Sequence, residues 1–175
     1  WLADDTRLKL ISATGSVAMG RDVNTRVAQR LGRSLLELSG NNALIISNQC
    51  DLDLALPAVL FSAIGTSGQR CTSLRRLIIQ QNICDQFIDS LISAYQSIRI
   101  GDPRDTKVHL GPLINQTAYE NMQTAIKLGL SQGGRLIYGG ARLTVSVPAG
   151  GYYVQPALME IDAQAEILQQ ETFAP

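Results

Sequence analysis

Short apolar runs alternate with longer amphipathic segments along the chain, and this alternation predicts strands that alternate with helices. Apolar residues at intervals of three or four positions indicate a helix face, whereas short apolar runs between turn residues indicate strands. The predicted strands cover residues 8–12, 35–38, 43–47, 74–80, a segment near 136 and residues 153–159, and the predicted helices cover residues 17–31, 51–64, 82–98 and 116–130.

Polar residues stand where several of these helices are expected to begin. Ser16 can cap the first helix, Asp51 or Asp53 the second, and Asn82 the third, because their side-chain oxygens can accept from free N–H groups of the first turn. The second helix has almost no polar face, so we expect it to be deeply buried.

Strands that alternate with helices of this length favour an α/β fold with a largely parallel sheet. A domain boundary is expected near Gly40, where a first strand–helix unit gives way to the longer remainder of the chain.

Charge and composition exclude several function classes. The 175 residues include 15 Lys plus Arg and 15 Asp plus Glu, and the basic residues are scattered, so nucleic acid is not an expected partner. No apolar stretch is long enough for a membrane span, so we expect no membrane association. The three cysteines are odd in number and lack CxxC spacing, which favours reduced thiols and a cytoplasmic location.

Cys71 is the first candidate for chemistry. It directly follows Arg70, after a turn at residues 65–68 that contains two glycines, and a neighbouring cation with free N–H groups favours the reactive thiolate. The alternative is a small buried hydrophobe, the usual role of cysteine, and Cys50 and Cys84 fit that alternative.

Glu37 is the second candidate, because it lies between two leucines at the predicted end of a strand. Apolar neighbours would desolvate its carboxylate and suit it to proton transfer. The alternative is a glutamate on a strand face that points to water. His109 is the only histidine and lies in a polar, loop-like stretch, so a carboxylate is the expected base.

Gly15 and Ser16 open a helix directly after a strand and therefore offer free N–H groups to a phosphate. The segment is not a GxGxxG fingerprint, and an ordinary strand-to-helix turn, which often contains glycine, is the favoured explanation.

Together these segments resemble the aldehyde dehydrogenase superfamily. Four motifs follow one another in that family's order: Ala13-Thr14-Gly15-Ser16 with Gly20, then Leu36-Glu37-Leu38-Ser39-Gly40-Asn41-Asn42, then Gly68-Gln69-Arg70-Cys71, and finally Glu171-Thr172-Phe173-Ala174-Pro175. The resemblance implies an incomplete catalytic domain over residues 40–175, preceded over residues 1–39 by the last strand–helix unit of a Rossmann-like NAD(P)-binding domain.

The resemblance also implies roles for the site residues. Cys71 would attack the aldehyde, its N–H would bind the oxyanion, and Glu37 would activate the water that hydrolyses the thioester after hydride transfer to NAD, or to NADP. Arg70 and Thr72 would contact the substrate. The implied cofactor contacts are Gly15 and Ser16 at the pyrophosphate, Leu38, Glu171 at the nicotinamide ribose, and Phe173 at the nicotinamide.

Three positions depart from the family pattern. Ala13 replaces a phenylalanine, Ser39 a glycine, and Ala174 a glycine. Ser39 is the position of concern, because a site adapted to glycine can require a positive φ that strains serine.

Within the superfamily, the segments around Glu37 and Cys71 look most like the α-aminoadipic semialdehyde dehydrogenase branch. Arg70 beside the nucleophile suits a substrate that carries a carboxylate. Methylmalonate semialdehyde dehydrogenases share this arginine, so Arg70 alone does not decide between the branches.

The chain begins at Trp1 and stops at Pro175 without a polar tail, so we expect a fragment of a longer, homo-oligomeric protein. One interpretation is part of an active dehydrogenase of small-molecule aldehydes. The other is a folded remnant without a complete cofactor site, because the family's asparagine oxyanion donor and ribose-binding lysine lie in the missing first half. Exposed apolar surface would favour self-association of such a fragment.

Overall fold

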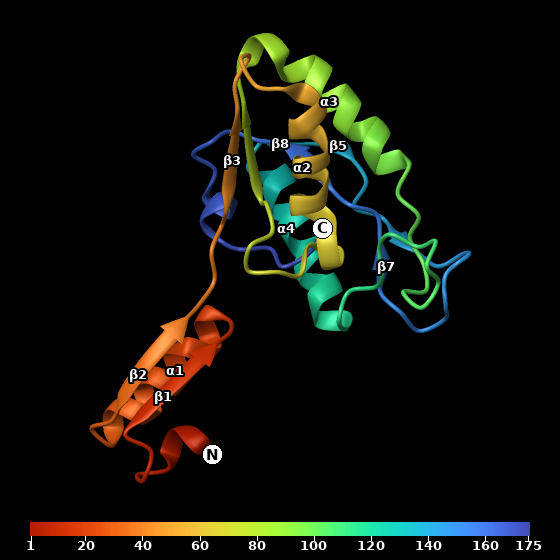
Figure 1. The fold of residues 1–175 in the computed structure, drawn as a ribbon. Coiled ribbons are helices and arrows are strands. Elements are labelled where there is room, and N and C mark those ends of the chain that lie inside the picture. The colour runs from red at the N-terminus through yellow and green to blue at the C-terminus, as the bar shows by residue number, and fades with distance from the viewer. The chain divides into compact units, whose positions relative to one another are not determined.

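The computed structural model describes residues 1–175, which divide into two compact units, Trp1–Gly40 and Asn41–Pro175 (Figure 1). None of the helices is both long enough and apolar enough to cross a membrane.

The first unit is a strand–helix–strand unit. The 3-10 helix η1 (Leu2–Asp4) precedes β1 (Leu10–Thr14), α1 (Val17–Gln29) and β2 (Arg33–Glu37). The strands pair in parallel, with Thr14 opposite Glu37. Ser16 caps α1 as expected, since its Oγ accepts from the Met19 N–H at 3.1 Å.

The helix α1 ends at Gln29, two residues earlier than predicted. Leu31 then adopts a φ of 59°, in the left-handed region that ends helices, and the Gly32 N–H donates back to the Val27 carbonyl.

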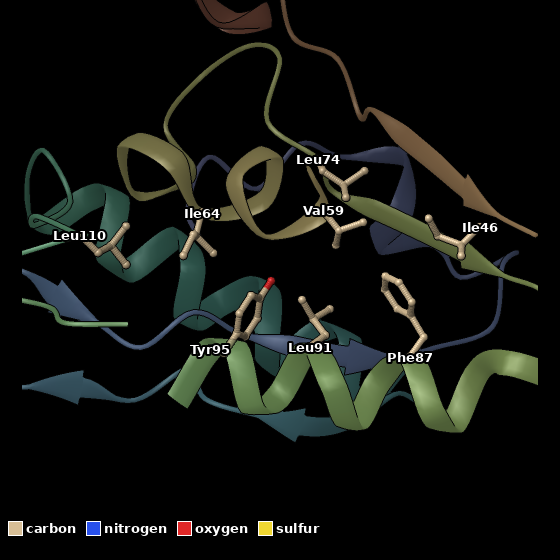
Figure 2. Packing of buried hydrophobic residues seen from close by; sticks show 8 residues of the cluster. All are labelled: Ile46, Val59, Ile64, Leu74, Phe87, Leu91, Tyr95 and Leu110. Carbon is tan, nitrogen blue, oxygen red and sulfur yellow. The ribbon is translucent and has the colours of Figure 1, made fainter. Parts of the chain in front are cut away.

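The second unit is built on the parallel pair of β3 (Ala43–Ile46) and β4 (Arg76–Ile79). Between these strands lie α2 (Leu52–Ile64) and the 3-10 turn η2 (Gly65–Gly68), and α3 (Gln81–Gln96) follows β4. Phe87, Leu91 and Tyr95 recur every four residues and project from one face of α3 toward β3 and α2 (Figure 2). The buried cluster that they form also contains Ile46, Val59, Ile64, Leu74 and Leu110.

The rest of the second unit is antiparallel. Asn115 caps α4 (Gln116–Ser131), and β5 (Arg135–Tyr138) then pairs with β8 (Leu158–Glu160). The short strands β6 (Arg142–Leu143) and β7 (Tyr153–Val154) form another pair, and the 3-10 helix η3 (Glu166–Gln169) follows β8. A second buried cluster contains Leu113, Met122, Val154 and Ala174.

The predicted α/β fold is confirmed, with a difference in the sheet. Parallel pairing holds for β1–β2 and β3–β4, whereas the later pairs are antiparallel. The strand expected over residues 153–159 is divided into β7 and β8 around Pro156, because proline has no N–H to donate to a ladder.

Two expectations about helices in the second unit were wrong. Asn82 does not cap α3, which starts after Gln80 without any side-chain cap; the Gln80 side chain instead accepts from the Asn48 N–H at 2.9 Å. The helix α2, which Asp51 caps as expected, is not deeply buried, because Leu54 and Phe61 are exposed. Only one face of α2 packs against other elements of the chain, so the apolar residues on its other face remain in solvent.

Candidate active site

The turn that leads to Cys71 has an unusual backbone. Thr66, Ser67 and Gly68 are consecutive residues in the left-handed region, with φ values of 56°, 54° and 64°. This conformation costs non-glycine residues roughly 1–3 kcal/mol each unless the surroundings hold it. Ser67 is buried and donates to the Gly111 carbonyl at 2.7 Å, which anchors the turn to a distant loop.

Asn42 fixes the backbone at Cys71 itself. Its Nδ2 donates to the Cys71 carbonyl at 2.6 Å and to the Ser73 carbonyl at 2.9 Å. The Cys71 side chain is exposed, and the Cys71 N–H makes no hydrogen bond within the chain. The turn therefore presents a thiol and a free N–H group side by side.

Gln69 ties the same turn to the loop after Gly111. Its Oε1 accepts from the Ile114 N–H at 2.8 Å, and its Nε2 donates to the Pro112 carbonyl at 3.4 Å. Both sides of Cys71 are thus fixed by amide side chains.

Arg70 does not bond to its neighbour Cys71. Its Nη2 donates to the Phe61 carbonyl at 2.9 Å, and its guanidinium lies 4.7 Å from the centre of the Phe61 ring. Its Nε is buried and has no partner. Arg70 is therefore held at the end of α2 with donor capacity left over, whereas Thr72 is exposed beside Cys71.

The other cysteines differ from Cys71, the only exposed one of the three. Cys50 packs against the cluster around Leu91. Burial raises the pKa of the Cys84 thiol, and the neighbouring charges of Asp85 and Glu160 raise it further.

Arg75 is a site residue that sequence reasoning missed, since the pair of arginines at 75 and 76 suggests solvated or paired surface charge. Its side chain is only 7% exposed. The guanidinium donates to the Gly68 carbonyl at 2.6 Å and to the Ala174 carbonyl at 2.8 Å, and it lies 5.4 Å from the centre of the Phe173 ring. It thereby joins the turn before Cys71 to the last segment of the chain.

Glu171 lies next to Arg75 and is almost as buried, with 10% of its side chain exposed. Its Oε1 is 3.9 Å from Arg75 Nη2, too far for a hydrogen bond, and this oxygen has no hydrogen-bond partner. A buried carboxylate oxygen without a donor is unusual. Because nothing in the chain donates to this carboxylate, its partly exposed side chain is suited to a ligand that brings a hydroxyl group.

The first unit holds the remaining candidates. Glu37 is the last residue of β2, and its carbonyl accepts from the Gly15 N–H at 3.0 Å. Leu38 packs against Gly20 of α1, where an added Cβ would lie 2.5 Å from the Leu38 side chain. The first unit does not provide the expected desolvation of Glu37. Its side chain is exposed, because residues 35 and 37 share a strand face that nothing in the unit covers.

Ser39 does not have a positive φ, so the strain anticipated at this glycine position is absent. Left-handed non-glycine residues occur instead at four other positions, two of which are Thr66 and Ser67.

The model of the aldehyde dehydrogenase family matches residues 1–175. The chain belongs to this family. It is 41% identical over 174 residues to aldehyde dehydrogenase family 7 member A1 of Brassica napus, covering 99% of this chain and 34% of the relative. It is 43% identical over 175 residues to alpha-aminoadipic semialdehyde dehydrogenase of Mus musculus, covering 99% of this chain and 32% of the relative. The chain thus spans about a third of the length of these curated relatives.

Solved aldehyde dehydrogenases share the fold. Betaine aldehyde dehydrogenase of Staphylococcus aureus in complex with NAD+ superposes with a TM-score of 0.95 at 26% identity, covering 99% of this chain and 35% of that one. Lactaldehyde dehydrogenase from Escherichia coli gives a TM-score of 0.91 at 32% identity, covering 99% and 36%.

The motifs of this aldehyde dehydrogenase chain fall into two groups. In the first unit, the Gly15 turn is hydrogen-bonded to the backbone of Glu37. In the second unit, Asn42 and Arg75 connect the Cys71 turn to the neighbouring motifs. The motif at residues 36–42 therefore supplies residues to both groups.

Proposed function

We propose that this chain is part of a longer NAD-dependent aldehyde dehydrogenase and provides its nucleophile, its base and several cofactor contacts. In this proposal residues 1–39 belong to the NAD(P)-binding domain and residues 40–175 to the catalytic domain. The observation that carries the proposal is the exposed Cys71 thiol beside an unbonded N–H on a turn that side chains hold in place.

Cys71 is the proposed nucleophile. Its thiolate attacks the aldehyde carbon, a C–S bond forms, and the carbonyl electron pair moves to oxygen, where the Cys71 N–H stabilises the charge. NAD, when bound, supplies the acceptor for the hydride that leaves this carbon. Glu37 then takes a proton from water as the water attacks the resulting thioester, and the C–S bond breaks to release the acid and the Cys71 thiolate.

The residues present fit the nicotinamide cofactor. The Glu171 carboxylate accepts no hydrogen bond within the chain and is suited to accept from a ribose hydroxyl, and the exposed Phe173 offers an aromatic ring near it. Gly15 and Ser16 lead into α1, whose first turn can bind a phosphate, and Leu38 packs against the same helix. NADP remains the alternative cofactor.

The proposed substrate is a small aldehyde that carries a carboxylate, such as α-aminoadipic semialdehyde. Arg70 places a guanidinium next to the nucleophile in the sequence, and a guanidinium binds carboxylates strongly; Thr72 adds a hydroxyl beside the nucleophile. Relatives at 42–43% identity are named alpha-aminoadipic semialdehyde dehydrogenases. We also propose that the longer protein is a homo-oligomer and that its free thiols are kept reduced in the cytoplasm.

Hydrolysis of p-nitrophenyl acetate tests the nucleophile, because acylation and deacylation of a thiol require no nicotinamide. We expect slow hydrolysis by the chain and loss of at least about 100-fold in Cys71→Ala. Cys84→Ala is the matched control and should retain the rate. Equal rates in all three proteins would rule out Cys71 as the nucleophile.

A folded remnant without dehydrogenase activity is the second candidate for the isolated chain. The sheet of the first unit has only two strands and exposes Leu10 and Leu35, so the unit offers little surface to position a cofactor. An unpositioned cofactor forfeits an advantage of roughly 7–11 kcal/mol. NADH formation from α-aminoadipic semialdehyde distinguishes the two: turnover that Cys71→Ala abolishes would make the chain an enzyme by itself.

A further inference from the structure

Arg75 connects segments that are far apart in the sequence. Its Nη2 donates to the Gly68 carbonyl, three residues before Cys71, and its Nη1 donates to the Ala174 carbonyl, three residues after Glu171. The two segments also touch directly, because a Cβ at Gly68 would lie 2.4 Å from the Ala174 oxygen. The Arg75 guanidinium thus stabilises a contact in which the two backbones are too close for a side chain at residue 68.

Glu171 compensates the positive charge of Arg75 without accepting a hydrogen bond from it. Burial lowers the pKa of this guanidinium, and the nearby Glu171 carboxylate acts in the opposite direction. Arg75 donates only to backbone carbonyls, those of Gly68 and Ala174 and, at 3.4 Å, that of Arg70, and it approaches Glu171 only to 3.9 Å. Glu171 therefore has a positive partner, while its Oε1 accepts no hydrogen bond from that partner.

We propose that Arg75 is a positioning residue that fixes the spacing between the Cys71 turn and the Glu171 carboxylate and leaves that carboxylate free of hydrogen bonds, so that it can bind a ligand hydroxyl. The roles of Cys71 and Glu171 in this statement rest on the proposed function. Lysine cannot replace the arginine here, because one ammonium group lacks the planar fork that reaches two carbonyls at once.

Hydrogen–deuterium exchange on the 175-residue chain tests the connection without substrate or cofactor. In Arg75→Lys, we expect exchange in residues 65–74 and in residues 169–175 to accelerate together by about tenfold or more, as the loss of a hydrogen bond from a charged donor implies. Exchange in α3 reports general destabilisation and should not change. Arg76→Lys is the matched control, since Arg76 bonds to the Asn41 carbonyl and to neither segment.

A double variant separates positioning from charge balance. Arg75→Met with Glu171→Gln leaves no unpaired buried charge, so the chain should fold even if Arg75→Met alone does not. Positioning by Arg75 predicts that both segments remain deprotected in the double variant. Exchange restored to the level of the unmodified chain would show that Arg75 only balances the charge of Glu171, and would overturn the proposal.

Acceleration in only one segment of Arg75→Lys, or in neither, would overturn it as well. Ester hydrolysis adds a functional readout: Arg75→Lys should lower kcat by about tenfold with little change in KM, because the nucleophile is misplaced and not removed. Unchanged kcat would contradict the positioning role. Absence of Cys71-dependent hydrolysis in the unmodified chain would count against the proposed function alone, since the exchange measurement stands without it.

Discussion

The Cys71 turn and the end of β2 at Glu37 carry the two proposed catalytic groups, and they differ in how much of their surroundings their own unit provides. Around Cys71, amide, hydroxyl and guanidinium side chains hold the backbone from several directions. Glu37 lies on an uncovered face of a two-stranded sheet, with the exposed Leu35 beside it. The backbone of the nucleophile is therefore fixed within residues 41–175, whereas the environment of the base is not supplied by residues 1–40.

The two sites differ because one is held by hydrogen bonds and the other depends on burial by apolar atoms. Single side chains can anchor a turn through hydrogen bonds to carbonyls, and such bonds need few residues. Desolvation of a carboxylate requires a complete layer of apolar atoms on the strand face, which needs further strands or helices. The second unit completes the first arrangement by itself, whereas the first unit does not complete the second.

Gly68→Ala should have the largest effect on the well-held region. The methyl group would meet the Ala174 oxygen at 2.4 Å, and a φ of +64° disfavours alanine, so we expect a loss of about 3 kcal/mol in urea unfolding followed by circular dichroism. Gly133→Ala is the control, because Gly133 has a φ of +87° but nothing within 4 Å. Similar losses in both variants would show that the contact with Ala174 contributes nothing.

Asn42→Ala removes the donor to the Cys71 and Ser73 carbonyls. We expect a loss of about 2 kcal/mol in the same unfolding measurement, because two carbonyls lose their partner. Asn48→Ala alters an exposed loop and should change stability by no more than about 0.5 kcal/mol. If the two variants were equally stable, the amide of Asn42 would not hold the turn.

Thiol labelling compares the turn with the helices of the same unit. At neutral pH, limiting iodoacetamide should modify Cys71 about tenfold faster than Cys84, which is partly buried. Because the pKa of Cys84 lies above its ordinary value, less Cys84 is thiolate at a given pH, and its labelling should rise only at more alkaline pH. Peptide mapping that finds Cys50 or Cys84 modified first would contradict this order.

Leu35→Ser should have the smallest effect on stability, within about 0.5 kcal/mol, because the side chain is 60% exposed. It should reduce self-association of the chain in sedimentation experiments, since it removes apolar surface. Val27→Ala is the contrasting variant, as Val27 is buried in the same unit and its truncation should cost about 2 kcal/mol. Unchanged self-association in Leu35→Ser would mean that this strand face is not responsible.

The order and type of the main elements could be predicted, because hydrophobic periodicity and the polar caps at Ser16 and Asp51 are local signals. The position of Glu37 at a strand end followed from the same pattern. Its exposure did not, because whether a strand face is covered depends on segments outside its own sequence neighbourhood.

Arg75 shows why part of the site could not be read from the sequence. Its partner Ala174 is 99 residues away along the chain, and no local pattern marks an arginine that will be buried against it. The prediction that Asn82 caps α3 was wrong for a different reason, because here a local signal was present but was not used. Gln80, two residues earlier, ends the strand segment and starts the helix directly, so the local signal at Asn82 was not used.

The left-handed turn at Thr66, Ser67 and Gly68 also determines how the second unit responds when one of its anchoring hydrogen bonds is lost. Conformational strain at the two non-glycine residues is released whenever the turn unwinds, and the bonds from Ser67 and Arg75 oppose that release. Loss of either bond should therefore lower the free energy needed to open the turn. We expect proteases to gain access to the nucleophile turn in variants that lack one of these bonds.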